Sequence, residues 1–208
     1  IYPFVNRTAL FRGQWGFKRG DLNDADYAKL EQKAEEVFAR LSEQCKREHI
    51  LRPQVVYGFW PCASEGNDLV VFDPKDHERE LERFSFPRQN GRQRLCISDF
   101  FRPRSAGERD VVAFHCVTMG VEVSHRAKQL FERNDYTEYL YLHGMGVECA
   151  EALAELWHKR IRAELGNSLF HECQRFRQLV LPDISSITHT DGENLITNEK
   201  TLIQIRLR

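Results

Sequence analysis

The chain has 208 residues, of which 41% are hydrophobic and 29% are charged. This composition is typical of a soluble protein that buries one sizeable core. The formal net charge of -1 gives no long-range field that would attract nucleic acid or an anionic membrane. No apolar run reaches the ~20 residues that a membrane span requires. We therefore expect no nucleic-acid partner and no membrane partner.

The six cysteines are spread along the chain without a C-x-x-C pair. That spacing fits neither a zinc site nor a disulfide framework, so we expect reduced, mostly buried thiols and a cytoplasmic location. His115 and Cys116 are neighbours in an expected strand, where successive side chains point to opposite faces, and no metal site is predicted there. The chain begins at Ile1 without a signal pattern, and we interpret it as a piece of a longer polypeptide or a trimmed form.

Residues 1–20 are rich in aromatic residues and contain three glycines, a pattern too irregular for one long helix. We call residues 1–20 the N-terminal tract and expect it to lie along the domain surface. A helix is expected from Asn23 or Asp24, either of which can cap it, to about His49. Its apolar residues recur at three- and four-residue steps, so we interpret it as a helix that covers a sheet.

The stretch 54–72 reads as a β-hairpin. Its first strand is almost entirely apolar or aromatic, which favours a strand buried on both faces. A polar turn over 63–67 leads to a return strand rich in β-branched residues. A more polar strand is expected at 79–87, and a second strongly buried strand at 110–118.

Two helices should follow the last of these strands, one over 121–132 and a longer helical region over 135–165. Gly144 and Gly146 lie inside the longer region, and because glycine weakens a helix we expect a break there. From Asn167 the periodicity is lost. A short helix is expected after this residue, followed by a weakly ordered tail that ends in a strand-like segment, TLIQIRLR.

No standard catalytic signature is present: the sequence has no G-x-S-x-G, H-E-x-x-H, Walker loop or G-x-G-x-x-G. We therefore predict no catalytic residue and no metal ligand. One polar constellation stands out, with Asn6 and Arg7 in the N-terminal tract and Glu148, Glu151 and Glu155 on the last long helix. If the tract packs across that helix, an acid there can face a positively charged ligand such as an amine or a sulfonium. The alternative is a solvated charged face.

Several collinear segments resemble one known family. They are LFRGQWGF in the tract, VVYGFWPCASEGNDLVVF, CISDFFRP, DVVAFHCVTMG, and NDYTEYLYLHGMGVECAEALAELWHKRIR. Together they are similar to the activation (reactivation) domain of vitamin B12-dependent methionine synthase. The resemblance covers residues 1–166, whereas 167–208 does not match the family. It implies a single α+β domain with a twisted antiparallel sheet and flanking helices.

The resemblance also implies a function in methionine biosynthesis. Domains of this family bind S-adenosylmethionine in a shallow groove and dock on the cobalamin-binding domain of the synthase, which holds the cobalamin. An electron from flavodoxin or a flavoprotein reductase, and a methyl group from S-adenosylmethionine, return inactive cob(II)alamin to methylcobalamin. The chain would then be part of a methyltransferase and not a complete enzyme by itself.

Two residues are carried over from the family pattern as cofactor-binding. Glu151 falls where the family has a ligand-contacting glutamate, and Asn6 falls where some members have an aspartate that holds the methionine amino group. The family also has an arginine and a G-Y-P-A-C-P-type segment after its last long helix, and no such segment follows Gly166. The alternative interpretation is a truncated remnant that does not bind the ligand and keeps only the fold or a protein-docking role.

Overall fold

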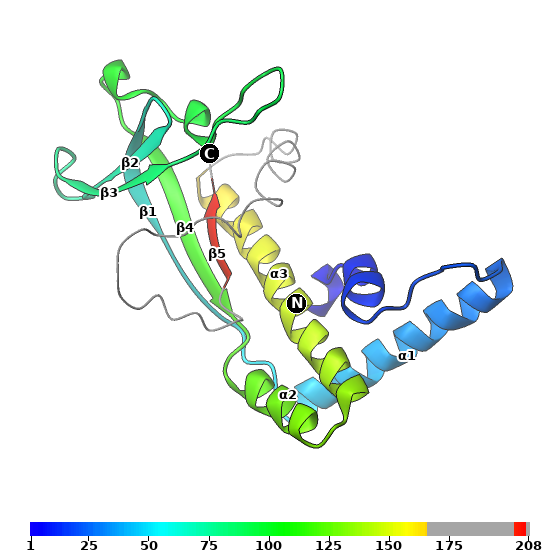
Figure 1. Cartoon of the computed structure of the whole chain (residues 1–208). Helices are drawn as coiled ribbons and strands as arrows, with labels where there is room; N and C mark the ends of the chain where they lie inside the picture. Colours follow the sequence, from blue (N-terminus) through cyan, green and yellow to red (C-terminus); the bar gives the residue numbers. More distant parts are fainter. Residues whose placement is uncertain (166–201, 207–208) are drawn as a thin grey trace.

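The computed structural model describes residues 1–165 and 202–206. The described strands form a five-stranded antiparallel sheet with the order β3-β2-β1-β4-β5, and helices flank it. The predicted α+β fold with flanking helices is therefore confirmed (Figure 1). In chain order the elements are η1 (Tyr2–Phe4), η2 (Ala9–Gln14), α1 (Asp24–Arg47), β1 (Gln54–Glu65), β2 (Asp68–Phe72), β3 (Glu80–Ser85), η3 (Ile97–Phe100), η4 (Arg104–Ala106), β4 (Asp110–Thr118), α2 (Glu122–Glu132), α3 (Tyr136–Glu164) and β5 (Leu202–Arg206).

The predicted hairpin is confirmed and is tighter than expected. β1 and β2 continue until Glu65 pairs with Asp68, which leaves only Gly66 and Asn67 in the turn. Gly66 has a φ of 60°, a left-handed conformation that glycine adopts without a steric penalty. The strands therefore use most of the polar segment that the sequence indicated as a loop.

The prediction that β1 is buried on both faces is wrong for its first half. Val56 is 76% exposed and Tyr57 is 38% exposed, whereas Cys62 and Ala63 are fully buried. The reason is the length of the strand, because β2 pairs only with Cys62 and the residues after it. The first half of β1 pairs with β4 along one edge, and among the described strands none pairs with its other edge, so side chains there lack neighbours on that side.

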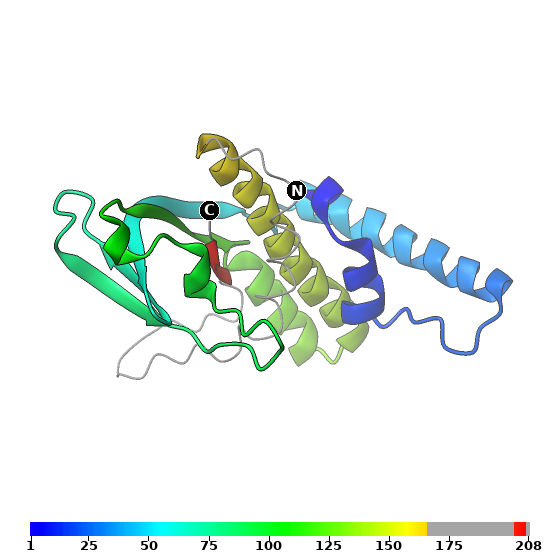
Figure 2. The same cartoon turned by 90° about the horizontal axis from the view of Figure 1, so that it is seen from above.

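The helix that covers the sheet is α3 and not α1. The Tyr57 ring meets the Trp157 ring edge-on, with centroids 5.8 Å apart, and Val117 of β4 belongs to the same apolar cluster as the buried side chains of α3. Both views show α1 beyond α3 and directed away from the sheet (Figures 1 and 2). Its buried Phe38 contacts rings of the N-terminal tract instead, so the sheet-covering interpretation of α1 is wrong.

The expected break in the last long helix is also wrong, because α3 is continuous across both glycines. Each glycine is a point of close approach. A Cβ atom on Gly144 would lie 2.7 Å from Cβ of Gln14, and a Cβ atom on Gly146 would lie 3.1 Å from Cγ2 of Val123. Close packing against the tract and α2 therefore explains why glycine occupies these two positions, although glycine lowers the helix propensity of α3.

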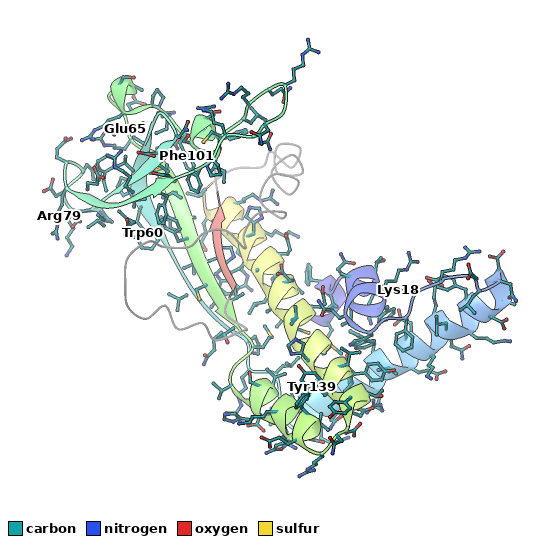
Figure 3. The ribbon with its side chains drawn as sticks, in the orientation of Figure 1. Lys18, Trp60, Glu65, Arg79, Phe101 and Tyr139 are labelled. Atoms are coloured by element: carbon teal, nitrogen blue, oxygen red, sulfur yellow. The ribbon has the colours of Figure 1, made fainter. Side chains whose placement is uncertain are left out.

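A second apolar cluster lies at the end of the sheet that is distant from α1, where Trp60 and Phe101 are found (Figure 3). Trp60 and Phe114 bring their rings to 5.4 Å across β1 and β4. The strand-like end of the chain is confirmed, since β5 pairs with β4, whereas the short helix expected after Asn167 lies outside the described residues. Within the described part of the chain, no helix has both the length and the apolar character to cross a membrane.

Candidate ligand site

The N-terminal tract contains a π-helix, η2, from Ala9 to Gln14. The backbone N–H of Trp15 donates to the Leu10 carbonyl at 2.9 Å, the five-residue step of a π-helix. Leu10 and Trp15 are both buried, so this wider turn aligns two side chains that an α-helix would place on different faces. π-helical turns are rare overall, but those that occur are often found at functional sites. The tract is therefore a candidate location for a functional site.

The tract docks on α3 by direct contacts. Trp15 Nε1 donates a hydrogen bond to the Tyr141 carbonyl at 3.0 Å, and the two rings lie 5.2 Å apart. Gln14 and Trp15 lie over Gly144, where a Cβ would reach 2.7 Å from Gln14 and 3.0 Å from Trp15. Both views show the tract beside α3 (Figures 1 and 2). The packing that the sequence hypothesis required between tract and helix is thus present.

Glu148 lies one turn further along α3 and is only 7% exposed. Its Oε1 accepts a hydrogen bond from Nε2 of Gln14 at 3.2 Å. Burial raises the pKa of the Glu148 carboxyl, and the hydrogen bond from the amide partly opposes that shift. A carboxylate is therefore held beneath the tract by a neutral partner.

Asn6 is exposed, and it has a structural role of its own. Its Oδ1 accepts a hydrogen bond from the Ala9 N–H at 3.1 Å, and its carbonyl accepts from the Leu10 N–H at 2.9 Å. This is the arrangement of a helix N-cap. The amide oxygen keeps a second lone pair and the amide nitrogen keeps its two protons, so the cap leaves Asn6 able to contact a ligand.

Glu151 is half-buried on α3 and follows Glu148 by three positions. Residues three apart on a helix are surface neighbours, and Glu155 continues the row. The structure therefore places these three acids on one stripe of α3, with the first of them covered by the tract. Asn6 and Glu151 lie on the two elements that pack together; their role in ligand binding stays a prediction.

Arg7 faces α1 rather than α3. Its guanidinium lies 3.2 Å from the centroid of the Phe38 ring and pairs with Glu35 at 3.3 Å. Beside this contact a cavity of about 340 Å³ lies between the tract and α1, lined by Arg12, Phe17 and other side chains. Arg7 thus secures the tract to α1, which the sequence hypothesis did not foresee.

The thiols near this junction are buried. Burial raises the pKa of Cys45 to about 11 and the pKa of Cys149 to about 12, so both stay protonated at neutral pH. His115 is buried and its neighbour Cys116 is half-exposed, as expected for residues on opposite faces of a strand. Among the described residues, no group of three potential ligands could hold a metal ion.

Fold and site together define an α+β domain in which an N-terminal tract is docked across α3, a long helix that covers the sheet. A family model described as "Vitamin B12 dependent methionine synthase, activation domain" matches residues 1–189. The chain belongs to this family. The match extends past residue 166, where the sequence changes character, and a division of the chain at that residue stays a prediction.

Two relatives from mycobacteria are similar to this chain. Methionine synthase of Mycobacterium tuberculosis (strain ATCC 25618 / H37Rv) is 42% identical over an alignment of 169 residues, and the match covers 77% of this chain. Methionine synthase of Mycobacterium leprae (strain TN) is 40% identical over an alignment of 170 residues, and the match covers 78% of this chain. The chain spans 14% of the length of each of them.

A solved structure supports the fold. The crystal structure of the MetH reactivation domain bound to AdoHcy superimposes with a TM-score of 0.65 at 21% sequence identity. The similarity covers 76% of this chain and 51% of that one. At this level of identity the likeness establishes a shared fold.

Proposed function

We propose that this chain binds S-adenosylmethionine at the junction of the N-terminal tract and α3 and supports the reactivation of methionine synthase. The observation that carries the proposal is the docking of the tract, which holds Asn6, on α3, which holds Glu151, through the contact of Gln14 with Glu148 and the close approach at Gly144. Membership of the activation-domain family supports it, as does the ligand of the structural relative, a domain bound to AdoHcy.

The residues present suit such a ligand. S-adenosylmethionine is a cation at sulfur and a zwitterion at its amino-acid end, and the stripe of acids on α3 provides carboxylates for its positive groups. The ligand supplies a methyl group to cobalamin, which a separate cobalamin-binding domain holds. What the chain contributes is orientation of the methyl donor, because transfer from a sulfonium needs placement rather than acid–base assistance.

The partners follow from this role. We propose the cobalamin-binding domain of methionine synthase and, as the electron source, flavodoxin or a flavoprotein reductase, with the whole assembly in the cytoplasm. The first 166 residues would form the activation-like domain, with 167–208 as a divergent tail. The chain is then one part of a methyltransferase.

Titration of the whole 208-residue chain with S-adenosylmethionine by isothermal calorimetry tests the proposal. We expect saturable binding, and we expect Glu151→Ala to weaken it at least ~5-fold, as for the loss of one hydrogen bond to a charged group. Glu132→Ala, which removes an exposed acid of α2, serves as the control and should leave the affinity unchanged. An unaltered affinity in Glu151→Ala would make Glu151 a surface acid only.

The alternative function is a non-binding remnant that keeps the fold for protein docking. The absence of a G-Y-P-A-C-P-type segment after Gly166 favours it. The same titration separates the two, since heat at the level of the buffer blank with millimolar S-adenosylmethionine would refute the binding function and leave the docking role.

A further inference from the structure

The buried position of Glu148 is unusual for a carboxylate side chain. It is almost completely buried, it accepts a hydrogen bond from the neutral amide of Gln14, and within the described part of the chain it forms no ion pair. A buried charge without a counter-charge is costly, and a neutral amide offsets that cost only in part. Glutamine or methionine would fill the same space without the cost.

The surroundings of Glu148 point to a ligand rather than to a purely structural role. It is the first member of the acidic stripe that continues to Glu151, and it lies under the tract that carries Asn6. Burial disfavours its charged form and raises its pKa, so a nearby cation would gain more from this carboxylate than from an exposed one. The missing counter-charge can therefore come from the ligand.

We propose that Glu148 is the specificity-determining residue that recognises the positive charge of the methyl donor, so that the domain prefers S-adenosylmethionine to S-adenosylhomocysteine. The inference rests on the proposed function and adds to it the residue that distinguishes the two ligands. They share the adenosine and amino-acid groups and differ by one methyl group and one charge at sulfur. When the S–CH₃ bond breaks, sulfur keeps the bonding electron pair and becomes a neutral thioether, which has no charge for Glu148 to attract.

The competing explanation is that Glu148 only holds the tract on α3 through its hydrogen bond with Gln14, a role that we call a clamp. Comparison of the affinities for the two ligands distinguishes this role from recognition of the charge. Glu148→Gln keeps the volume and an oxygen that can accept from Gln14, but it removes the charge. Charge recognition predicts that Kd for S-adenosylmethionine rises about tenfold while Kd for S-adenosylhomocysteine stays within about twofold. A clamp would change both Kd values by the same factor.

The experiment measures both Kd values by calorimetry on the whole chain for the native sequence, Glu148→Gln, Glu148→Asp and Glu132→Gln. Glu148→Asp keeps the charge and should keep the preference for S-adenosylmethionine. Glu132→Gln removes an equal charge from an exposed position on α2 and should change neither Kd. If circular dichroism shows that Glu148→Gln does not fold, Glu148→Met takes its place as an uncharged residue suited to burial.

Each outcome decides between the explanations. A selective loss of S-adenosylmethionine affinity supports charge recognition. Equal losses for both ligands, or no loss for either, overturn it and leave the proposed function standing. Failure of the native chain to bind either ligand overturns the proposed function and this inference together.

Discussion

Replacement of Gly144 by alanine tests whether the N-terminal tract is docked on α3 as the structure shows. The new Cβ would lie 2.7 Å from Cβ of Gln14 and 3.0 Å from Nε1 of Trp15. Both neighbours are held in place, Gln14 by its own main chain and Trp15 by burial and by its bond to the Tyr141 carbonyl. The tract must therefore move for the methyl group to fit.

Three free-energy contributions determine how Gly144→Ala changes stability. Alanine favours the helix by about 1 kcal/mol over glycine, whereas overpacking of this kind costs about 1–3 kcal/mol. Complete undocking would expose Leu10, Phe11 and Trp15, at roughly 5–9 kcal/mol in total. The tract should thus shift and remain docked. We expect a net loss of about 1 kcal/mol, which lowers Tm by about 2–4 °C for a chain of this size.

The matched control is Gly146→Ala in the same helix. It has the same propensity gain, but its Cβ meets only the two methyl groups of Val123, at 3.1 and 3.8 Å, so its Tm should be equal to or above that of the native chain. Thermal unfolding followed by circular dichroism gives both values, and the fluorescence of the buried Trp15 reports movement of the tract. The docking geometry is refuted if Gly144→Ala melts at or above Gly146→Ala with unchanged fluorescence.

Three further predictions concern the site, the sheet edge and the thiols. Asn6→Asp keeps the N-cap, because aspartate caps as well as asparagine, and should raise affinity for S-adenosylmethionine about threefold through the added charge; a calorimetric Kd that is unchanged or weaker would contradict this. Deletion of 202–208 removes β5 from β4 and should lower Tm by about 4 °C or more, whereas deletion of 207–208 should not; equal melting temperatures would show that β5 does not stabilise the sheet. Because burial raises the pKa of Cys45 and Cys149 above the ordinary value of 9.0, their contribution to stability is complete below about pH 9 and is lost as the pH rises toward 11–12; a Tm that stays constant from pH 8 to pH 11 would argue against it.

Elements encoded by local signals could be predicted from the sequence. The helix from Asp24 begins where Asn23 caps it, with the Asn23 side chain accepting from the Asp26 N–H at 2.9 Å, and its apolar stripe fixed its length to within two or three residues. The strand predicted over 110–118 matches β4, because its β-branched residues favour a strand over a helix. These signals lie within one element and need no knowledge of its neighbours.

Features that depend on contacts between distant segments could not be predicted in the same way. Helix propensity is a local quantity and predicts a break at Gly144 and Gly146, whereas in the structure these glycines leave room for Gln14 and Val123. The exposure of the first half of β1 depends on where β2 stops pairing along its edge. The direction of α1 depends on the tract that occupies its apolar side.

The tract shows how a local signal can be present and still be missed. Leu10 and Trp15 are both buried and are five residues apart, which fits neither the 3.6-residue period of an α-helix nor the two-residue period of a strand. It fits η2, whose bond from the Trp15 N–H to the Leu10 carbonyl makes that step a single turn. The wider turn brings Trp15 onto Tyr141 and Gln14 onto Glu148. A rare backbone form thus creates the contact on which the candidate site depends, and a search for five-residue spacing would have found it.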